Sequence, residues 1–488
     1  MKAASTPFKK KKRQSGVWLT LLPLYLFTLV FVAGPLVYMV VLSFQTRAEV
    51  WGVVNQFTLD NYKNIFQPVY LNTFVESFKL ALTSTALISA IGYPFGYFMA
   101  KLPAQWKKRV MLLLMIPFWT SSLIRLYGWI IIFRANGTLD KLLMGLGLTS
   151  PLKLLYTYPA VVVGMVYALL QFMILAVYSS AEKMDWSLVE AARDLGASPL
   201  KAFLTVTLKL TLPGLLSGVI LTFIPSMGLF FIADILGGNK VVLVGSLIQD
   251  QLMKAHNWPF AAALSVVLMV LTTLMISLYK RVTHTTRTGG HLMKNRTKLP
   301  NIYLGVVTAV MYLPIVLVII YSFNESKISS VWGGFSLKWY ETLFRDGAMF
   351  EALGTASFWG CAPAWRRGRH RHAGCLRLHQ GAARTKNAVE YISMLPIMIP
   401  EIILGMVFMA FFALIGLPFG MTTLILAHTA FCIPYVYMLV KARLVGMDKS
   451  LPEAARDLGA GEARVFFDIT LPLLAPAILP PACCSASP

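Results

Sequence analysis

The stretch Glu190-Ala191-Ala192-Arg193-Asp194-Leu195-Gly196-Ala197 occurs a second time, letter for letter, as Glu453-Ala454-Ala455-Arg456-Asp457-Leu458-Gly459-Ala460. Each copy is a polar island between long apolar runs. This pattern predicts a duplicated membrane protein with one soluble loop in each half. Two identical loops on one side of a membrane indicate a partner with two-fold symmetry on that side.

Composition supports the membrane assignment. Hydrophobic residues make up 57% of the chain and charged residues 13%, and the mean hydropathy is +0.66, outside the usual range of soluble proteins. A helix needs about 20 apolar residues to cross a bilayer. The apolar windows of sufficient length predict membrane spans at 18–43, 76–100, 109–134, 155–179, 210–236, 258–280, 301–323, 390–415 and 419–440, and a span that begins near 471 and stops early.

The positive charge of the chain lies next to the predicted spans. The formal net charge is +23, which by itself would suggest a nucleic-acid partner. However, six basic residues lie in the segment 1–17, before the first span, and six more lie between Lys280 and Lys298, at the end of the first half and in the linker. Clusters beside span ends are what the positive-inside bias produces, so we expect no nucleic acid and place the N-terminus in the cytoplasm.

The repeat extends well beyond the octapeptide. Ser43-Phe44 matches Ser322-Phe323, and Pro117 matches Pro396, each at an offset of 279 residues. Six spans return the chain to the cytoplasm, so the second half enters with the same orientation, as a parallel repeat. The predicted fold is therefore an all-α integral membrane protein of two parallel six-span repeats, the second incomplete. The first half covers 18–280 with its soluble loop at 180–209, and the second covers 300–480 with its loop at 441–472.

Two segments do not fit the repeat. The segment 355–385 should be the second span of the second half, but it contains Trp365-Arg366-Arg367-Gly368-Arg369-His370-Arg371-His372. Each such charge at a bilayer centre costs about 2.5–3.5 kcal/mol, so no span survives there. The repeat offset is nevertheless kept across it, which indicates compensating frameshifts. The tail 480–488, which halts the last span, is interpreted in the same way.

These two segments also hold most of the cysteines. A metal site at Cys361, Cys375, His370, His372 and His379 is the alternative to out-of-frame sequence, but the spacing matches no zinc pattern. We therefore predict no metal site. Met293 in the linker is either the former start of a separate gene, which would make the chain a gene fusion, or an ordinary linker methionine.

The two loops resemble a known motif. After Gly459 the second copy continues to Ile469 and then Leu471-Pro472, and it resembles at every defined position the EAA motif of ATP-binding-cassette importer permeases. The first copy has Val206 and Leu208 at the corresponding sites, but Lys209 replaces the proline. This resemblance implies a short coupling helix in each loop, seated in a groove on one of two cytoplasmic ATPase subunits.

The same resemblance assigns roles within each loop. Glu190 and Glu453 would make polar contacts with the ATPase, and Gly196 and Gly459 would turn the chain. The alanines Ala191, Ala192, Ala454 and Ala455 would allow close approach. The chain contains no Gly-x-x-x-x-Gly-Lys-Ser/Thr loop, so we expect no enzyme activity in this chain, with ATP and Mg²⁺ bound by the partner. The alternative is that each loop only caps the helix bundle.

Other segments narrow the family. Pro117-Phe118-Trp119-Thr120-Ser121-Ser122 and Phe223-Ile224-Pro225-Ser226-Met227-Gly228 resemble segments of the first permease of spermidine/putrescine importers, and Pro400-Glu401-Ile402-Ile403-Leu404-Gly405 resembles one of the second. The resemblance implies a multi-pass permease of the bacterial inner membrane, among membrane lipids. It also implies a small cationic cargo delivered by a periplasmic solute-binding protein.

A polycation needs carboxylates and aromatic faces along its route. Asp234 and Glu401 are the candidate carboxylates, and the candidate aromatic walls are Trp119, Tyr127, Trp129, Phe230 and Phe231. The alternative for the aromatics is helix packing or anchoring at the membrane interface. By the 279 offset, Arg125 and Glu401 lie one helical turn apart on equivalent spans, so an ion pair is the alternative to a cargo contact for Glu401.

Two rival functions remain at this point. A secondary transporter driven by an ion gradient would not need the duplicated soluble loop. A defective, non-transporting relic of the permease would explain the two segments that break the repeat. Of the three functions we favour a membrane permease of an ATP-driven importer, with polyamines as its cargo.

Overall fold

The computed structural model describes most of the chain and divides it into two compact units. Unit 1 comprises Met1–Val41 and Gly347–Pro488, and unit 2 comprises Leu42–Asp346. The residues that the structure describes are 26–49, 52–147, 152–282, 298–326, 332–355, 401–432, 450–461, 464–470 and 472–473. Residues 356–385 and the tail 480–488, for which we predicted out-of-frame sequence, lie outside these ranges, as does the early-ending span from 471 apart from two residues.

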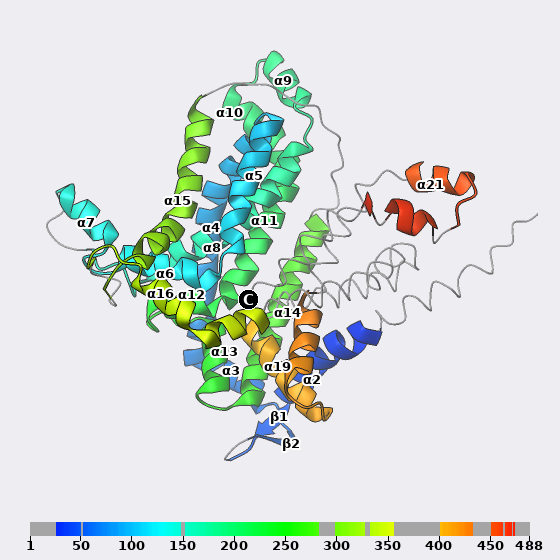
Figure 1. Cartoon of the computed structure of the whole chain (residues 1–488). Helices are drawn as coiled ribbons and strands as arrows, with labels where there is room; N and C mark the ends of the chain where they lie inside the picture. The colour runs from blue at the N-terminus through cyan, green and yellow to red at the C-terminus, as the bar shows by residue number, and fades with distance from the viewer. Residues whose placement is uncertain are drawn as a thin grey trace, which may run out of the picture. The chain divides into compact units, whose positions relative to one another are not determined.

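Helices dominate both units (Figure 1). Unit 1 contains η1 (Leu29–Ala33), most of α2 (Gly34–Ser43), α19 (Glu401–Leu414), α21 (Ser450–Asp457) and η3 (Val465–Thr470). The elements of unit 2 are β1 (Gln45–Arg47), β2 (Val53–Phe57), α3 (Asp60–Ile65), α4 (Pro68–Ala100), α5 (Ala104–Trp119), α6 (Ser122–Phe133), α7 (Thr138–Gly145), α8 (Tyr158–Glu182), α9 (Ser187–Asp194), α10 (Pro199–Ala202), η2 (Phe203–Thr207), α11 (Leu208–Gly228), α12 (Phe230–Gly237), α13 (Val244–Met253), α14 (Trp258–Val282), α15 (Lys298–Ser322) and α16 (Lys338–Arg345). Strands β1 and β2 pair antiparallel.

Several helices are membrane-spanning candidates. Within the described residues, six helices are long and apolar enough to cross a membrane, or seven if one bent pair counts as a single span. Two shorter apolar helices, Leu404–Leu414 and Met421–Cys432, are the described parts of the spans predicted at 390–415 and 419–440. The all-α membrane fold predicted from hydropathy is confirmed.

Two predicted spans are not single straight helices. In place of one helix at 109–134, Ala104–Trp119 and Ser122–Gly145 meet at 90°. Thr120 and Ser121 adopt extended backbone conformations between them, with ψ of 146° and 132°. The predicted span 210–236 is likewise broken at Leu229, where ψ is 68°, into α11 and α12. Hydropathy counts apolar residues and does not register such local breaks.

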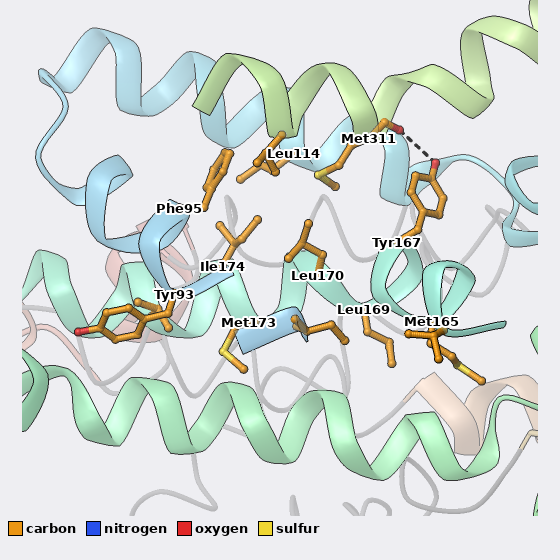
Figure 2. Close-up of a cluster of buried hydrophobic side chains, with 14 of the residues drawn as sticks. Tyr93, Phe95, Leu114, Met165, Tyr167, Leu169, Leu170, Met173, Ile174 and Met311 are labelled. Carbon is orange, nitrogen blue, oxygen red and sulfur yellow. Dashed lines mark hydrogen bonds between the residues drawn. The ribbon is translucent and has the colours of Figure 1, made fainter. Parts of the chain in front are cut away.

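The core of unit 2 lies where α8 packs against α4 and α11, and α8 supplies much of it (Figure 2). Close approach depends on small residues. A Cβ at Gly96 of α4 would lie 2.8 Å from the carbonyl oxygen of Ile174, and one at Gly214 of α11 would lie 2.8 Å from that of Ala176. Dispersion contacts between closely packed backbones are a main source of helix association in membranes.

Helix α15 belongs to the second repeat by sequence but packs on the first. Three hydrogen bonds, each from a tyrosine hydroxyl to a backbone carbonyl, join it to helices of the first repeat. Tyr303 donates to Ile91 at 2.6 Å and Tyr312 to Leu113 at 2.8 Å, while Tyr167 of α8 donates to Met311 of α15 at 3.1 Å, the bond drawn in Figure 2. Each acceptor lies in the turn before a helix-interior proline, and Leu113, four residues before Pro117, is the one whose own helical N–H donor the proline removes.

Unit 1 contains the reciprocal arrangement. There the N-terminal helix packs on α19, with the rings of Tyr38 and Phe411 6.4 Å apart. A Cβ at Gly34 would lie 2.9 Å from the Phe411 ring. By the 279-residue offset, the N-terminal helix corresponds to α15 and α19 corresponds to α6. In each unit, therefore, the first span of one repeat packs on the third-span region of the other repeat, as α15 does on α6.

The contact between α6 and α15 can be tested at Gly128. A Cβ there would lie 2.4 Å from the carbonyl oxygen of Pro314, which is backbone and cannot rotate away. We expect Gly128→Ala to lower the free energy of unfolding by about 1–3 kcal/mol, the usual cost of overpacking. Thermal unfolding of the purified protein in detergent measures this.

The matched control is Gly305→Ala on α15, where nothing lies within 4 Å of the added Cβ. Alanine is favoured over glycine inside a helix, so this variant should be neutral or slightly stabilising. Equal unfolding temperatures for the two variants would contradict the close contact between α6 and α15.

Candidate functional site

The first octapeptide begins inside the short helix α9. Its local sequence explains the helix: Glu190 lies in the first turn, where a carboxylate interacts favourably with the helix dipole. Gly196 ends the helix with φ of +86°, a left-handed conformation that favours glycine. The amide of Leu195 donates to Ala191 at 3.0 Å and that of Ala197 to Ala192 at 3.0 Å, which closes the end of the helix.

The second octapeptide folds in the same way. Helix α21 has the sequence SLPEAARD where α9 has SLVEAARD, and Gly459 has φ of +85°. Leu458 and Ala460 donate to Ala454 and Ala455, both at 3.0 Å, repeating the bonds of the first copy. The sequence identity therefore extends to the backbone geometry, although the two helices lie in different units.

Each short helix is followed by a π-helix at the start of the next apolar segment. The first is η2 and the second is η3, and their shared residues are related by the same offset of 263 that relates the octapeptides. Single π-helical turns are rare and occur often at functional sites. Nothing in the sequence distinguished these turns from ordinary α-helix.

The exposed side chains of the two loops form matching sets. Glu190 and Glu453 are exposed, as are Ala191 and Ala454, whereas Ala192 and Ala455 are half-buried. Leu195 and Leu458, which the sequence did not single out, are both 89% exposed, more than any other large hydrophobic side chain that the structure describes. A leucine within an otherwise polar loop, at the same place in both copies, was the available signal. A single exposed leucine is common on protein surfaces, so what distinguishes these two is that they occupy the same place in both loops.

The start of α9 is attached to the ends of α4 and α8. Trp186, whose carbonyl opens α9, is buried, and its ring centre lies 5.5 Å from that of Tyr97. The ammonium of Lys101, at the end of α4, lies 4.3 Å from the Tyr97 ring centre and 5.0 Å from that of Trp186. Glu182, the last residue of α8, accepts hydrogen bonds from Tyr178 at 2.6 Å and from Lys107 at 3.4 Å.

Asp234 lies at the opposite end of unit 2 from α9. Figure 1 shows α9 and α10 at one end of this unit's helices and α12 and α13 at the other. Asp234 is half-buried on α12 and accepts a hydrogen bond from the Ser246 hydroxyl at 2.9 Å. Nearby on α13, Asp250 pairs with Lys254 at 2.7 Å. If α9 faces the cytoplasm, Asp234 faces outward.

Arg125 is buried near the start of α6, 6% exposed. One of its terminal nitrogens donates to the Ser122 hydroxyl at 3.1 Å, and the guanidinium lies 5.8 Å from the Tyr167 ring centre. Its Nε has no hydrogen-bond partner in the described part of the chain. Glu401 opens α19, but its side chain lies outside what the structure describes, so the ion pair stays a prediction.

The five candidate aromatic residues do not form one wall. Trp129 is buried and packs edge-on to Tyr167 at 5.5 Å, as the packing alternative expects. Trp119 and Tyr127 are 52% and 61% exposed. Phe230 and Phe231 are half-buried, with ring centres 6.0 Å apart. Among the described residues, no other two of these five aromatic side chains are in ring contact with each other.

No candidate metal centre was found in the described ranges, which hold no group of three or more His, Cys, Asp or Glu side chains able to hold an ion. The residues of the metal alternative, Cys361, Cys375, His370, His372 and His379, all lie outside those ranges.

Comparisons with known proteins agree with the duplicated loops. The family described as "Binding-protein-dependent transport system inner membrane component" matches residues 92–288 and 381–487, one match in each half. The spermidine/putrescine transport system permease protein PotB of Escherichia coli (strain K12) is 42% identical over 252 residues, which are 51% of this chain and 92% of that protein.

Two further similarities were found. The putrescine transport system permease protein PotI of Escherichia coli (strain K12) is 39% identical over 176 residues, 35% of this chain and 63% of that protein. A crystal structure of a bacterial ABC transporter involved in the import of alginate has a TM-score of 0.44 at 17% identity, covering 56% of this chain and 97% of that chain.

The family match covers more than half of the chain, and its two parts carry the two copies of the octapeptide. A secondary transporter, the rival left open by the sequence, does not belong to this family. The chain is a member of the binding-protein-dependent transport system inner membrane components, the permeases of ATP-binding-cassette importers.

Proposed function

We propose that this permease imports polyamines and is driven by two cytoplasmic ATPase subunits, one docked on α9 and one on α21. The observation that carries the docking proposal is the shared geometry of the two loops. Both present a glutamate in the first helical turn, a left-handed glycine at the end and a leucine that is 89% exposed. Two equal surfaces suit two equal partners.

The proposal divides the work between this chain and its partners. ATP and Mg²⁺ would bind to the ATPases, because this sequence has no phosphate-binding loop of its own. The N-terminus and both loops would face the cytoplasm, in keeping with the basic segments at 1–17 and 281–299. A periplasmic solute-binding protein would deliver cargo to the opposite face, as the family description implies.

Polyamine cargo is supported by the relatives and by one carboxylate. PotB and PotI are named as spermidine/putrescine and putrescine permeases. Asp234 lies at the end of unit 2 away from α9, where an arriving cation would meet it. Glu401, Trp119, Tyr127, Trp129, Phe230 and Phe231 remain proposed path residues, and Trp129 is the one whose burial favours packing.

We also propose that 355–385 and 480–488 arise from shifts of reading frame. Resequencing the gene across codons 350–390 and 475–488 should then reveal compensating single-base insertions or deletions that restore apolar spans. An unchanged sequence would favour the rival, a relic that binds its partners but does not transport.

The docking proposal predicts the effect of removing both exposed leucines. Burying a leucine contributes about 1.5–3 kcal/mol, so Leu195→Ser combined with Leu458→Ser should lower the amount of ATPase that co-purifies by at least roughly tenfold. Each single variant should have a smaller effect. The matched control is Leu146→Ser, which removes a leucine that is 77% exposed outside both loops. Undiminished co-purification by the double variant would contradict docking at these loops.

The cargo proposal predicts a defect in uptake alone. Asp234→Asn removes the negative charge and keeps the shape, so labelled spermidine uptake should fall by roughly tenfold or more, since a lost charged contact costs about 1.5–3 kcal/mol. Co-purification of the ATPases should be unchanged. Asp60→Asn, at an exposed site on α3, is the control. If Asp234→Asn takes up spermidine at the normal rate, this carboxylate does not contact the cargo.

A further inference from the structure

We propose that Tyr97, Lys101 and Trp186, here called the coupling-helix clamp, transmit movement of the docked ATPase from α9 to the membrane helix α4. The proposal rests on docking at α9, and it adds the residues through which that docking acts on the membrane helices. The three side chains position the coupling helix and do not touch ATP or cargo.

The clamp joins the C-terminal end of α4 to the residue that precedes α9. Tyr97 is in the last turn of α4, Lys101 directly follows that helix, and Trp186 opens α9. The Lys101 ammonium lies 4.3 Å and 5.0 Å from the two ring centres, within the range of cation–π attraction. The rings themselves lie 5.5 Å apart, so all three contacts form one cluster.

The cluster continues into the membrane helices. Phe203, the first residue of η2, lies edge-on to Tyr97 at 6.0 Å and to Tyr93 at 5.9 Å. Tyr93 is buried and hydrogen-bonded to Thr211 of α11 at 2.7 Å. Helices α4 and α11 both pack on α8. A movement of Trp186 would therefore press on the core of unit 2 and displace these helices.

Charge makes the cluster sensitive to what binds α9. Burial lowers the pKa of Lys101, and the nearby positive charge of Arg193 on α9 lowers this pKa further. The two like charges oppose each other while the rings hold Lys101 in place. An ATPase that offers an acidic group to Arg193 would relieve this repulsion and tighten the contact between α9 and α4.

The sequence does not repeat Trp186, because by the 263 offset Lys449 stands at the corresponding place in the second half. The position that matches Tyr97 by the 279 offset lies in 355–385, the segment for which we propose a shifted reading frame.

The test compares Lys101→Met with Lys101→Arg in proteoliposomes that contain the permease and its ATPases and are supplied with the solute-binding protein. The readout is the number of ATP molecules hydrolysed per spermidine molecule imported. We expect Lys101→Met to raise this ratio at least threefold while the ATPases still co-purify. Lys101→Arg, which keeps the cation over both rings, should keep the normal ratio.

Arg109→Met is the matched control, because Arg109 makes a similar contact, 5.0 Å from the ring centre of the exposed Trp106, with no aromatic ring of α9 or its N-cap in that contact. Its ratio should be normal. If Lys101→Met unfolds in detergent, Trp186→Leu provides the same measurement with the cation retained.

A normal ratio for Lys101→Met with bound ATPase would overturn the proposal. So would loss of ATPase binding, because the clamp would then serve docking rather than transmission. Failure of the unaltered chain to bind the ATPases would instead refute docking at α9. The docking proposal and the clamp proposal are therefore refuted by different measurements.

Discussion

Backbone carbonyls next to helix-interior prolines set a constraint on which the arrangement of unit 2 depends. A proline in a helix cannot donate to the carbonyl four residues before it, and a carbonyl without a partner is costly where water is absent. Pro117 leaves the carbonyl of Leu113 without its helical donor in this way, whereas the carbonyls of Ile91 and Met311 lie three residues before Pro94 and Pro314, in the turn that the proline ring crowds. All three carbonyls accept hydrogen bonds from tyrosine hydroxyls on neighbouring helices.

These bonds connect irregular backbone to tertiary structure. The tyrosine hydroxyls hold α15 against α4, α5 and α8 at places where a proline deprives a helix of one backbone N–H donor. Gly128 completes the arrangement, because only a residue without a side chain fits against Pro314. Each helix-interior proline that weakens its own helix therefore lies beside a hydrogen bond to a neighbouring helix.

Much of this architecture could be predicted from the sequence, for identifiable reasons. Membrane helices follow from long apolar runs, and the parallel duplication follows from the octapeptide and its offset. The breaks at Thr120 and Leu229 were not predicted, because a hydropathy window averages over the short polar run Thr120-Ser121-Ser122 and over Gly228, the local residues at which the backbone turns. Burial of Trp129 and exposure of Leu195 depend on which helix face meets a neighbour, and hydropathy alone carries no such information.

The exchange of first spans between the repeats has a consequence for biosynthesis. The N-terminal helix leaves the ribosome long before its packing partner α19 has been synthesised. Likewise, the helices of the first repeat receive α15 only after the linker has been translated. Neither unit can complete its packing while only the first repeat has been synthesised. Until the second repeat is inserted, the interface residues of the earlier helices must contact lipid or a chaperone.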